Sequence, residues 1–298
     1  MTTGERKIEV NGFLAGGVEA GIREPGRKDL ALLYSEVPAA AAAVFTKSAV
    51  KAAPVLLDMQ RIRKGRAQAI VINSGNANAA TGRPGYRDAV EMAGAVARRT
   101  GLREDLVLVA STGVIGKRLP LERIIASMDS LVRGLKPSGI ADAEEAIMTT
   151  DSFPKIEFRK ILLGSRTVTL CGLAKGAGMI EPHMATMLSF VLTDAAVQPG
   201  CLRTLLKRAC DRTFNCISVD GCMSTNDTVI ILANGKAGNR PLTESSKELR
   251  RFELALTGVM EGLARSIVRD GEGATKVIEI VVQGARNERH ARRVAYGI

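Results

Sequence analysis

The sequence predicts an α/β protein. Runs of Val, Ile, Leu and Ala at strand length alternate along the whole chain with longer segments of helical pattern, as expected when helices cover mixed sheets. A hydrophobic fraction of 46% over 298 residues is enough to bury a substantial core, in one large domain or two lobes. Because aromatic residues make up only 3% and Trp is absent, that core must be packed mainly from aliphatic side chains.

The first half of the chain is expected to alternate strands with helices. Short apolar runs bounded by polar turns predict the strands, and longer periodic stretches predict the helices. The strands are expected at 29–34, 53–57, 67–72 and 106–110, and the helices at about 86–99, 121–135 and 140–148.

The second half continues this alternation. Two strand-like runs that meet at Gly164-Ser165 predict a hairpin. The strands are expected at 156–163, 167–172, 187–192, 229–233 and 277–283, and the helices at about 199–212 and 243–269, with a helix-like segment at the end.

The composition argues against several classes of function. The net charge is +11, but Lys and Arg are scattered and no basic run is interleaved with aromatic residues, so we expect no nucleic-acid partner. The five cysteines lack Cys-x-x-Cys spacing and the two histidines form no paired pattern, so we expect buried thiols and no metal site. Neither a membrane span nor a signal peptide is expected, which predicts a soluble cytoplasmic protein.

Two polar loops follow predicted strands in the first half. Residues 73–82 read Asn-Ser-Gly-Asn-Ala-Asn-Ala-Ala-Thr-Gly before a helix, which fits either a phosphate cradle or a turn-rich loop. This loop lacks the Gly-Lys-Ser/Thr of a P-loop. Residues 111–117 read Ser-Thr-Gly-Val-Ile-Gly-Lys, and such a loop can direct a hydroxyl group and a backbone N–H at one point, as a developing oxyanion requires.

The stretch from 174 to 192 joins a glycine loop to a predicted strand, and it carries the most specific chemistry. Thr186 stands just before the apolar run, where a threonine hydroxyl alone is a poor nucleophile. If the bond between Ala185 and Thr186 is cut, Thr186 gains an α-amine with a pKa of roughly 8, which suits a general base for its own hydroxyl group. The alternative is an ordinary threonine at the edge of a strand.

The segment Lys-Gly-Ala-Gly-Met-Ile-Glu-Pro-His-Met-Ala-Thr-Met-Leu, residues 175–188, resembles the self-cleaving motif of the ornithine acetyltransferase family, the bifunctional glutamate N-acetyltransferases also called ArgJ. The Asn-Ser-Gly-Asn-Ala-Asn and Ser-Thr-Gly-Val-Ile-Gly motifs are also similar to that family, as is the opening around 29–46. The resemblance covers essentially the whole chain.

The resemblance implies an architecture of mixed β-sheets sandwiched by helices, shared with the N-terminal-nucleophile-like aminopeptidases. It also implies self-cleavage between Ala185 and Thr186. An α chain of residues 1–185 and a β chain of residues 186–298, which begins with the nucleophile, would then associate as an α2β2 assembly.

The resemblance also implies a role for each site residue. Thr186 would be the nucleophile and would contact substrate, and Thr112 and Gly113 would stabilise the oxyanion. Lys175 fits a substrate carboxylate and Glu272 a substrate amine, since Glu272 stands between glycines in a predicted tight turn. The remaining substrate-binding residue is expected in the Thr-Thr-Asp segment, with Thr149 preferred to Thr150.

The implied activity moves the acetyl group of N2-acetylornithine to glutamate through an acetyl-Thr enzyme, as a step of arginine biosynthesis. No cofactor is implied, and acetyl-CoA stays open as a second acetyl donor. Two alternatives remain. One is a Thr-nucleophile amidohydrolase or aminopeptidase, in which water resolves the intermediate. The other is an inactive folding or association module.

Three departures from the family pattern bear on the activity. His183 stands where the family generally has Asn, and Cys222-Met223 where it usually has Asp-Thr. Family members also continue beyond the point that matches the end of this chain, with a segment that supplies further substrate-binding residues and helps to build the oligomer. We therefore expect either a fragment or a shortened member of the family.

Overall fold

The computed structural model describes residues 8–181 and 187–298 of the chain. Within these residues the strands form one sheet in the order β4-β3-β2-β8-β7-β6-β5, with β1 paired to β2 outside this path. The strands are β1 (Phe13–Val18), β2 (Leu30–Phe45), β3 (Arg66–Asn73), β4 (Val107–Ser111), β5 (Lys155–Leu163), β6 (Arg166–Lys175), β7 (Leu188–Thr193) and β8 (Thr228–Ala233). The helices are α1 (Ala53–Arg61), α2 (Gly82–Thr100), α3 (Leu121–Arg133), α4 (Ile140–Ile147), α5 (Pro199–Arg212), α6 (Leu249–Arg269) and α7 (Glu288–Gly297), with 3₁₀ turns at Ile62–Lys64, Glu104–Leu106 and Phe214–Cys216.

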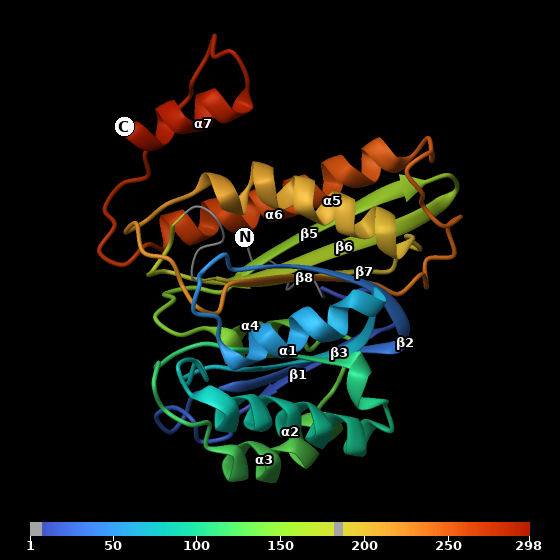
Figure 1. Cartoon of the computed structure of the whole chain (residues 1–298). Coiled ribbons are helices and arrows are strands. Elements are labelled where there is room, and N and C mark those ends of the chain that lie inside the picture. The colour runs from blue at the N-terminus through green and yellow to red at the C-terminus, as the bar shows by residue number, and fades with distance from the viewer. Residues whose placement is uncertain (1–7, 182–186) are drawn as a thin grey trace, which may run out of the picture.

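Strand β2 organises the sheet because it belongs to two layers. Its 16 residues pair with β1 and β3 over the first half and with β8 over the end, and the register shifts between Tyr34 and Ala39. A bulge of this kind bends and twists a strand. Figure 1 shows the result, with β1 to β3 in one layer, β5 to β8 in another, α5 and α6 covering one outer face and α2 and α3 the other.

Three large apolar clusters fill the main spaces of this arrangement, and a small fourth cluster lies between α1 and the loop 73–82. One apolar cluster lies between α5, α6 and the β5–β8 layer, a second between the two layers of strands, and a third between the β1–β4 layer and α1, α2 and α3. The short helix α4 contributes its buried face to the central cluster and contacts β1 and β2. Its C-terminal end therefore delivers the following loop to the middle of the molecule.

Most of the predicted elements are confirmed, but the strand expected at 53–57 is wrong. These residues begin helix α1, with Pro54 in its first turn, where the missing N–H is tolerated. Asp58 and Arg61 continue the buried face beyond the apolar run. A five-residue apolar run does not distinguish a strand from the first turns of a buried helix.

The strand expected at 277–283 is also wrong, because no described strand pairs with this segment. Most of its apolar residues are exposed, with Ile278 at 80% and Val281 at 68%. Helix α7 follows and lies beyond α6 at one corner of the molecule (Figure 1), where the Tyr296 hydroxyl donates to the Asn215 carbonyl. None of the described helices has the length and apolar character needed to cross a membrane.

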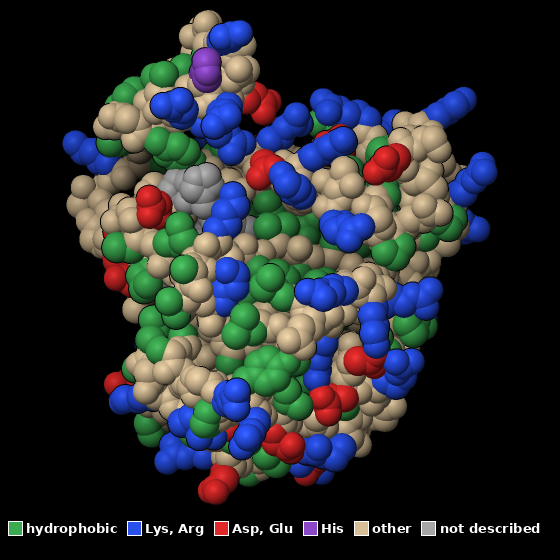
Figure 2. Space-filling view, viewed as in Figure 1, with side chains coloured by type: hydrophobic (Ala, Val, Ile, Leu, Met, Phe, Trp, Pro, Cys, Tyr) green, Lys and Arg blue, Asp and Glu red, His purple; other side chains and the backbone are tan. Residues whose placement is uncertain are grey.

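Charged side chains are distributed over the surface as the sequence suggests. On the face drawn in Figure 2, Lys and Arg are spread over several elements, with acidic and apolar side chains between them.

Candidate functional site

The ends of several strands meet at one edge of the β5–β8 layer. Lys175, the last residue of β6, pairs with Leu188, the first residue of β7, and Leu188 pairs in turn with Thr228 of β8. The Met187 N–H donates to Asp227 Oδ1 at 3.2 Å, and the Met187 carbonyl accepts from Thr228 N at 3.1 Å. The sequence-predicted residues His183, Ala185 and Thr186 lie outside the described residues, and the description resumes at Met187.

Asn226 joins the other layer of strands to this edge. Its Nδ2 donates to the carbonyl oxygens of Ala77 and Ser111, at 2.6 and 2.8 Å. Ser111 ends β4, so this bond places Thr112 and Gly113 next to the loop that holds Asp227. The two predicted oxyanion residues are thereby brought to the same region as Lys175.

The backbone around Thr112 and Gly113 limits which groups can bind a ligand. The Thr112 N–H donates to the Asn73 carbonyl at 3.0 Å, whereas its hydroxyl group makes no hydrogen bond to any described residue. Gly113 is exposed and has φ of +129°, and a Cβ there would lie 2.3 Å from the Gly75 carbonyl carbon. The close approach of two backbone segments therefore requires glycine at 113.

The loop 73–82 uses its polar side chains to hold this arrangement. Asn73 Nδ2 donates to the Asn76 carbonyl at 2.8 Å, and Ser111 Oγ donates to Asn73 Oδ1 at 2.6 Å. Asn78 Nδ2 donates to the Gly85 carbonyl at 2.8 Å. Because these groups are occupied by internal hydrogen bonds, the structure favours the turn-rich loop over the phosphate cradle.

Lys175 presents a buried charge. Only 4% of the residue is exposed, and its ammonium forms no hydrogen bond or ion pair with any described residue. Burial lowers the pKa of Lys175, while the carboxylates of Asp151 and Glu272 act in the opposite direction. A buried ammonium group without a direct partner is costly, so the position favours an anionic ligand.

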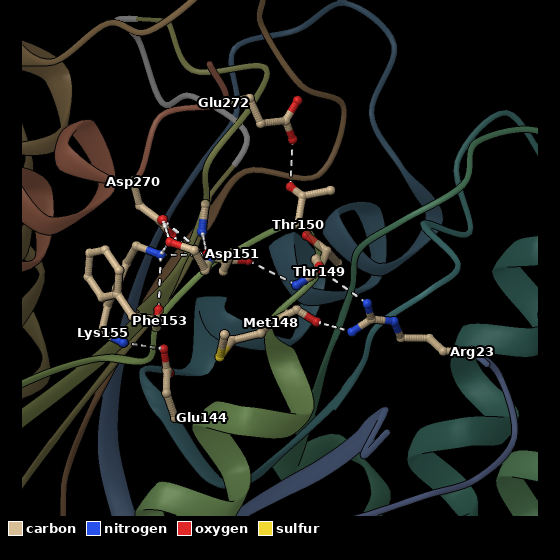
Figure 3. A network of polar contacts seen from close by, with 12 residues as sticks. Arg23, Glu144, Met148, Thr149, Thr150, Asp151, Phe153, Lys155, Asp270 and Glu272 are labelled. Carbon is tan, nitrogen blue, oxygen red and sulfur yellow. Dashed lines mark hydrogen bonds and ion pairs between the residues drawn. The ribbon is translucent and has the colours of Figure 1, made fainter. Parts of the chain in front are cut away.

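Glu272 lies over the glycine loop that follows Lys175. The Glu272 N–H donates to the Ala177 carbonyl at 2.8 Å, and the Thr150 hydroxyl donates to Glu272 Oε1 at 2.6 Å (Figure 3). A Cβ at Gly178 would lie 2.7 Å from Glu272 Cδ, so a side chain at that position would displace the Glu272 carboxylate. Thr150 is thus engaged by Glu272, whereas the Thr149 hydroxyl makes no hydrogen bond to the described residues. The role of Thr149 in binding substrate stays a prediction.

Arg23 is a site residue that the sequence does not reveal. Its guanidinium donates to the carbonyls of Met148 and Thr149, at 2.6 and 2.9 Å (Figure 3). Its aliphatic stem lies against Gly75. It therefore connects the Thr149 loop to the loop beside Gly113. No motif distinguishes Arg23 from the other arginines, because the bonds span 125 and 126 residues.

The loop that contains Cys222-Met223 is ordered by another residue. Asp220 accepts hydrogen bonds from the backbone N–H groups of Met179, Ile180 and Cys222, at 2.5, 2.8 and 3.1 Å. The side chains at 222 and 223 are exposed and take no part in these bonds. The departure from Asp-Thr is therefore compatible with an ordered loop.

The buried carboxyl group of Asp227 should make the stability of the protein depend on pH. The residue is fully buried, and Oδ2 has no hydrogen-bond partner in the described structure. Burial raises its pKa well above the usual range, and the Met187 N–H opposes this only in part. As the pH rises above about 4, the unfolded chain loses this proton while the folded chain retains it, so the wild type loses stability. We expect the stability of Asp227→Asn, measured by urea unfolding, to increase relative to wild type over this range.

Asp105→Asn is a control, because its stability relative to wild type is expected to change with pH in the opposite direction. The hydrogen bond from Lys64 is the main cause of the lowered pKa of Asp105, so its carboxylate stabilises the fold above pH of about 4. This variant should lose stability relative to wild type as the pH rises. If the difference in stability from wild type changed with pH in the same direction for both variants, the assignment for Asp227 would be contradicted.

The chain is similar to known proteins over nearly its whole length. A model of the ArgJ family matches residues 14–298. The arginine biosynthesis bifunctional protein ArgJ of Geobacter sulfurreducens is 54% identical over 291 residues, which cover 98% of this chain and 74% of that protein. The protein of the same name from Symbiobacterium thermophilum is 53% identical over 289 residues, with 96% and 72% covered.

Solved structures agree with these matches. A crystal structure of the ornithine acetyltransferase of Mycobacterium tuberculosis, in complex with ornithine, has a TM-score of 0.53 and 39% identity, covering 59% of this chain and 96% of that one. An aminopeptidase from Ochrobactrum anthropi, described as a variant of the Ntn hydrolase fold, has a TM-score of 0.54 at 13% identity, with 88% and 85% covered. At that identity the likeness concerns the fold alone, and it confirms the predicted N-terminal-nucleophile-like α/β architecture.

Proposed function

The chain belongs to the ArgJ family, and on that premise we propose that it transfers the acetyl group of N2-acetylornithine to glutamate. In this proposal the bond between Ala185 and Thr186 is cut by the protein itself. The α chain of 1–185 and the β chain that begins at Thr186 associate as α2β2. Family membership supports an acyltransferase of arginine biosynthesis, and the specific donor and acceptor are our inference.

The proposed reaction has two steps. The Thr186 hydroxyl attacks the acetyl carbonyl while the α-amine of the same residue takes its proton, and the amide bond then breaks as this proton passes to the departing ornithine amine. In the second step the α-amine of glutamate attacks the acetyl ester, which yields N-acetylglutamate and free Thr186. The Thr112 hydroxyl and the Gly113 N–H stabilise the oxyanion in both steps, and each such donor contributes about 3 kcal/mol.

The observation that carries the proposal is the buried Lys175 ammonium, which has no direct partner among the described residues. Amino-acid substrates bring the α-carboxylate that such a cation requires. The Glu272 carboxylate lies on the adjoining loop and is exposed, so it can receive an ammonium group of the substrate. A cation and an anion at one site suit the two charged ends of an amino acid.

A single-turnover experiment tests this function. The protein is mixed with excess N-acetylornithine, and the intact mass is followed for the addition of one acetyl group. Glutamate is then added, and N-acetylglutamate and acetate are quantified. We expect an acetyl-enzyme whose decay yields N-acetylglutamate in proportion to the glutamate added. Acetate as the sole product would instead indicate a hydrolase, and the absence of an acetyl-enzyme would rule out the mechanism. A parallel run with acetyl-CoA tests the second donor.

A further inference from the structure

Lys155 holds a buried ionic network beside the candidate site. It is the first residue of β5, its side chain is 0% exposed, and its ammonium contacts Asp151 Oδ1 at 2.7 Å and Asp270 Oδ2 at 2.5 Å. The side chains of Asp151 and Asp270 are 0% and 4% exposed. The Phe153 ring covers the ammonium at 4.8 Å from its centroid (Figure 3). This cation is not part of the proposed reaction, yet it lies at the centre of the polar contacts.

Asp151 connects Lys155 to two of the substrate-binding segments. Its Oδ1 also accepts the Gly176 N–H at 2.7 Å, which fixes the peptide that follows Lys175. Its Oδ2 accepts the Thr149 N–H at 2.9 Å. Burial alone would raise the pKa of Asp151, but the ammonium groups of Lys175 and Lys155 hold it below its usual range. The group is therefore a carboxylate that accepts all of these hydrogen bonds.

Asp270 connects Lys155 to the third segment. It ends helix α6 two residues before Glu272 and accepts the Ser152 N–H at 3.0 Å, in addition to the Ser152 hydroxyl. The turn that carries Glu272 is thus tied to the loop after α4 at both ends, by Asp270 with Ser152 and by Glu272 with Thr150. Without the ammonium of Lys155, two buried carboxylates would face each other and repel.

We propose that Lys155 is a positioning residue that sets the relative placement of Thr149, Lys175 and Glu272, and so determines the affinity for the amino-acid substrate. This inference rests on the proposed function of the site. Lys155 lies on a strand, whereas the three residues it organises belong to the segments after α4, at the end of β6 and after α6. A displacement of these three groups weakens the contacts that hold the bound substrate, so it is expected to raise KM and the dissociation constant more than it lowers kcat.

The test compares Lys155→Met and Lys155→Gln with wild type. Lys28→Met is the control, because the Lys28 ammonium also joins two carboxylates, Asp142 at 2.7 Å and Glu145 at 2.8 Å, but its side chain is 30% exposed and makes no hydrogen bond or ion pair with a described residue of the candidate site. The dissociation constant for ornithine is measured by titration calorimetry. KM for N-acetylornithine is measured on the same preparations, and kcat is expressed per acetyl-enzyme formed.

We expect both Lys155 variants to raise the dissociation constant and KM by at least about tenfold, with kcat per acetyl-enzyme within about threefold of wild type. Lys28→Met should leave both constants unchanged. The Gln variant keeps N–H donors and should be the milder of the two. A purely structural role would reduce the yield of active protein without changing KM or the dissociation constant, and that result overturns the proposal.

The remaining outcomes also decide the question. If both Lys155 variants fail to fold, Lys155 is a folding element and the positioning role is rejected. If wild type binds ornithine but transfers no acetyl group, the proposed function fails while the ratio of dissociation constants still tests Lys155. If wild type binds no ornithine, the assignment of an amino-acid site organised by Lys155 is wrong.

Discussion

Thr186→Ala should remain a single polypeptide and should lose acetyl transfer by a factor on the order of 10⁴ or more. Alanine has no hydroxyl group to attack the preceding peptide bond, and the uncut chain has no free α-amine at position 186 to act as a base. Intact mass under denaturing conditions gives the expected result directly. Wild type should separate into pieces of 1–185 and 186–298, whereas the variant should keep the mass of the whole chain.

Thr186→Ser separates the cleavage from the chemistry that follows it. Serine retains a hydroxyl group and, after cleavage, an α-amine, so this variant should still be cut and should form an acetyl-enzyme, more slowly than wild type. The proposal would be contradicted if Thr186→Ala were cut at the same bond, or if its acetyl transfer matched that of wild type.

The sequence predicts most of this fold because strand runs and helical periods are local. The β-branched residues at the end of the β3 run favour a strand, and the helical period in α6 is long enough to identify a helix. The segment 53–57 is too short for that decision, and the segment 277–283 has strand composition but no described strand beside it. Composition can indicate a strand, but only a neighbouring strand can satisfy its backbone groups.

The site divides into residues that motifs reveal and residues that only the fold reveals. The resemblance points to Lys175 and Glu272, and the structure brings both to one region. The bond between Lys155 and Asp270 spans 115 residues, as does the bond between Asn226 and the Ser111 carbonyl. No local pattern encodes such pairs, because each residue alone resembles an ordinary surface charge or turn amide.

Thr112→Val should lower kcat by about 10²- to 10³-fold with little change in stability. The hydroxyl group makes no hydrogen bond to the described residues, so replacing it with a methyl group removes a ligand for the oxyanion and no bond that holds the fold. The Thr112 N–H is already bound to the Asn73 carbonyl, so it cannot replace the missing donor. Single-turnover acetylation at saturating N-acetylornithine measures the effect. A Thr112→Val variant as fast as wild type would remove Thr112 from the oxyanion site.

Gly113→Ala should lose both activity and stability, and the contrast with Thr112→Val identifies the physical cause. The added Cβ would lie 2.3 Å from the Gly75 carbonyl carbon and 2.5 Å from the Asn76 nitrogen, so two backbone segments must separate. Gly101→Ala is the control, since Gly101 also has positive φ, at +72°, but a Cβ there meets nothing within 4 Å. Gly101→Ala should cost about 1 kcal/mol of stability and no activity.

If Gly113→Ala behaved like Gly101→Ala, the close approach of the 75 and 113 segments would not matter for the site. Loss of acetylation together with a lower midpoint of urea unfolding would show that this approach positions the Gly113 N–H for the oxyanion.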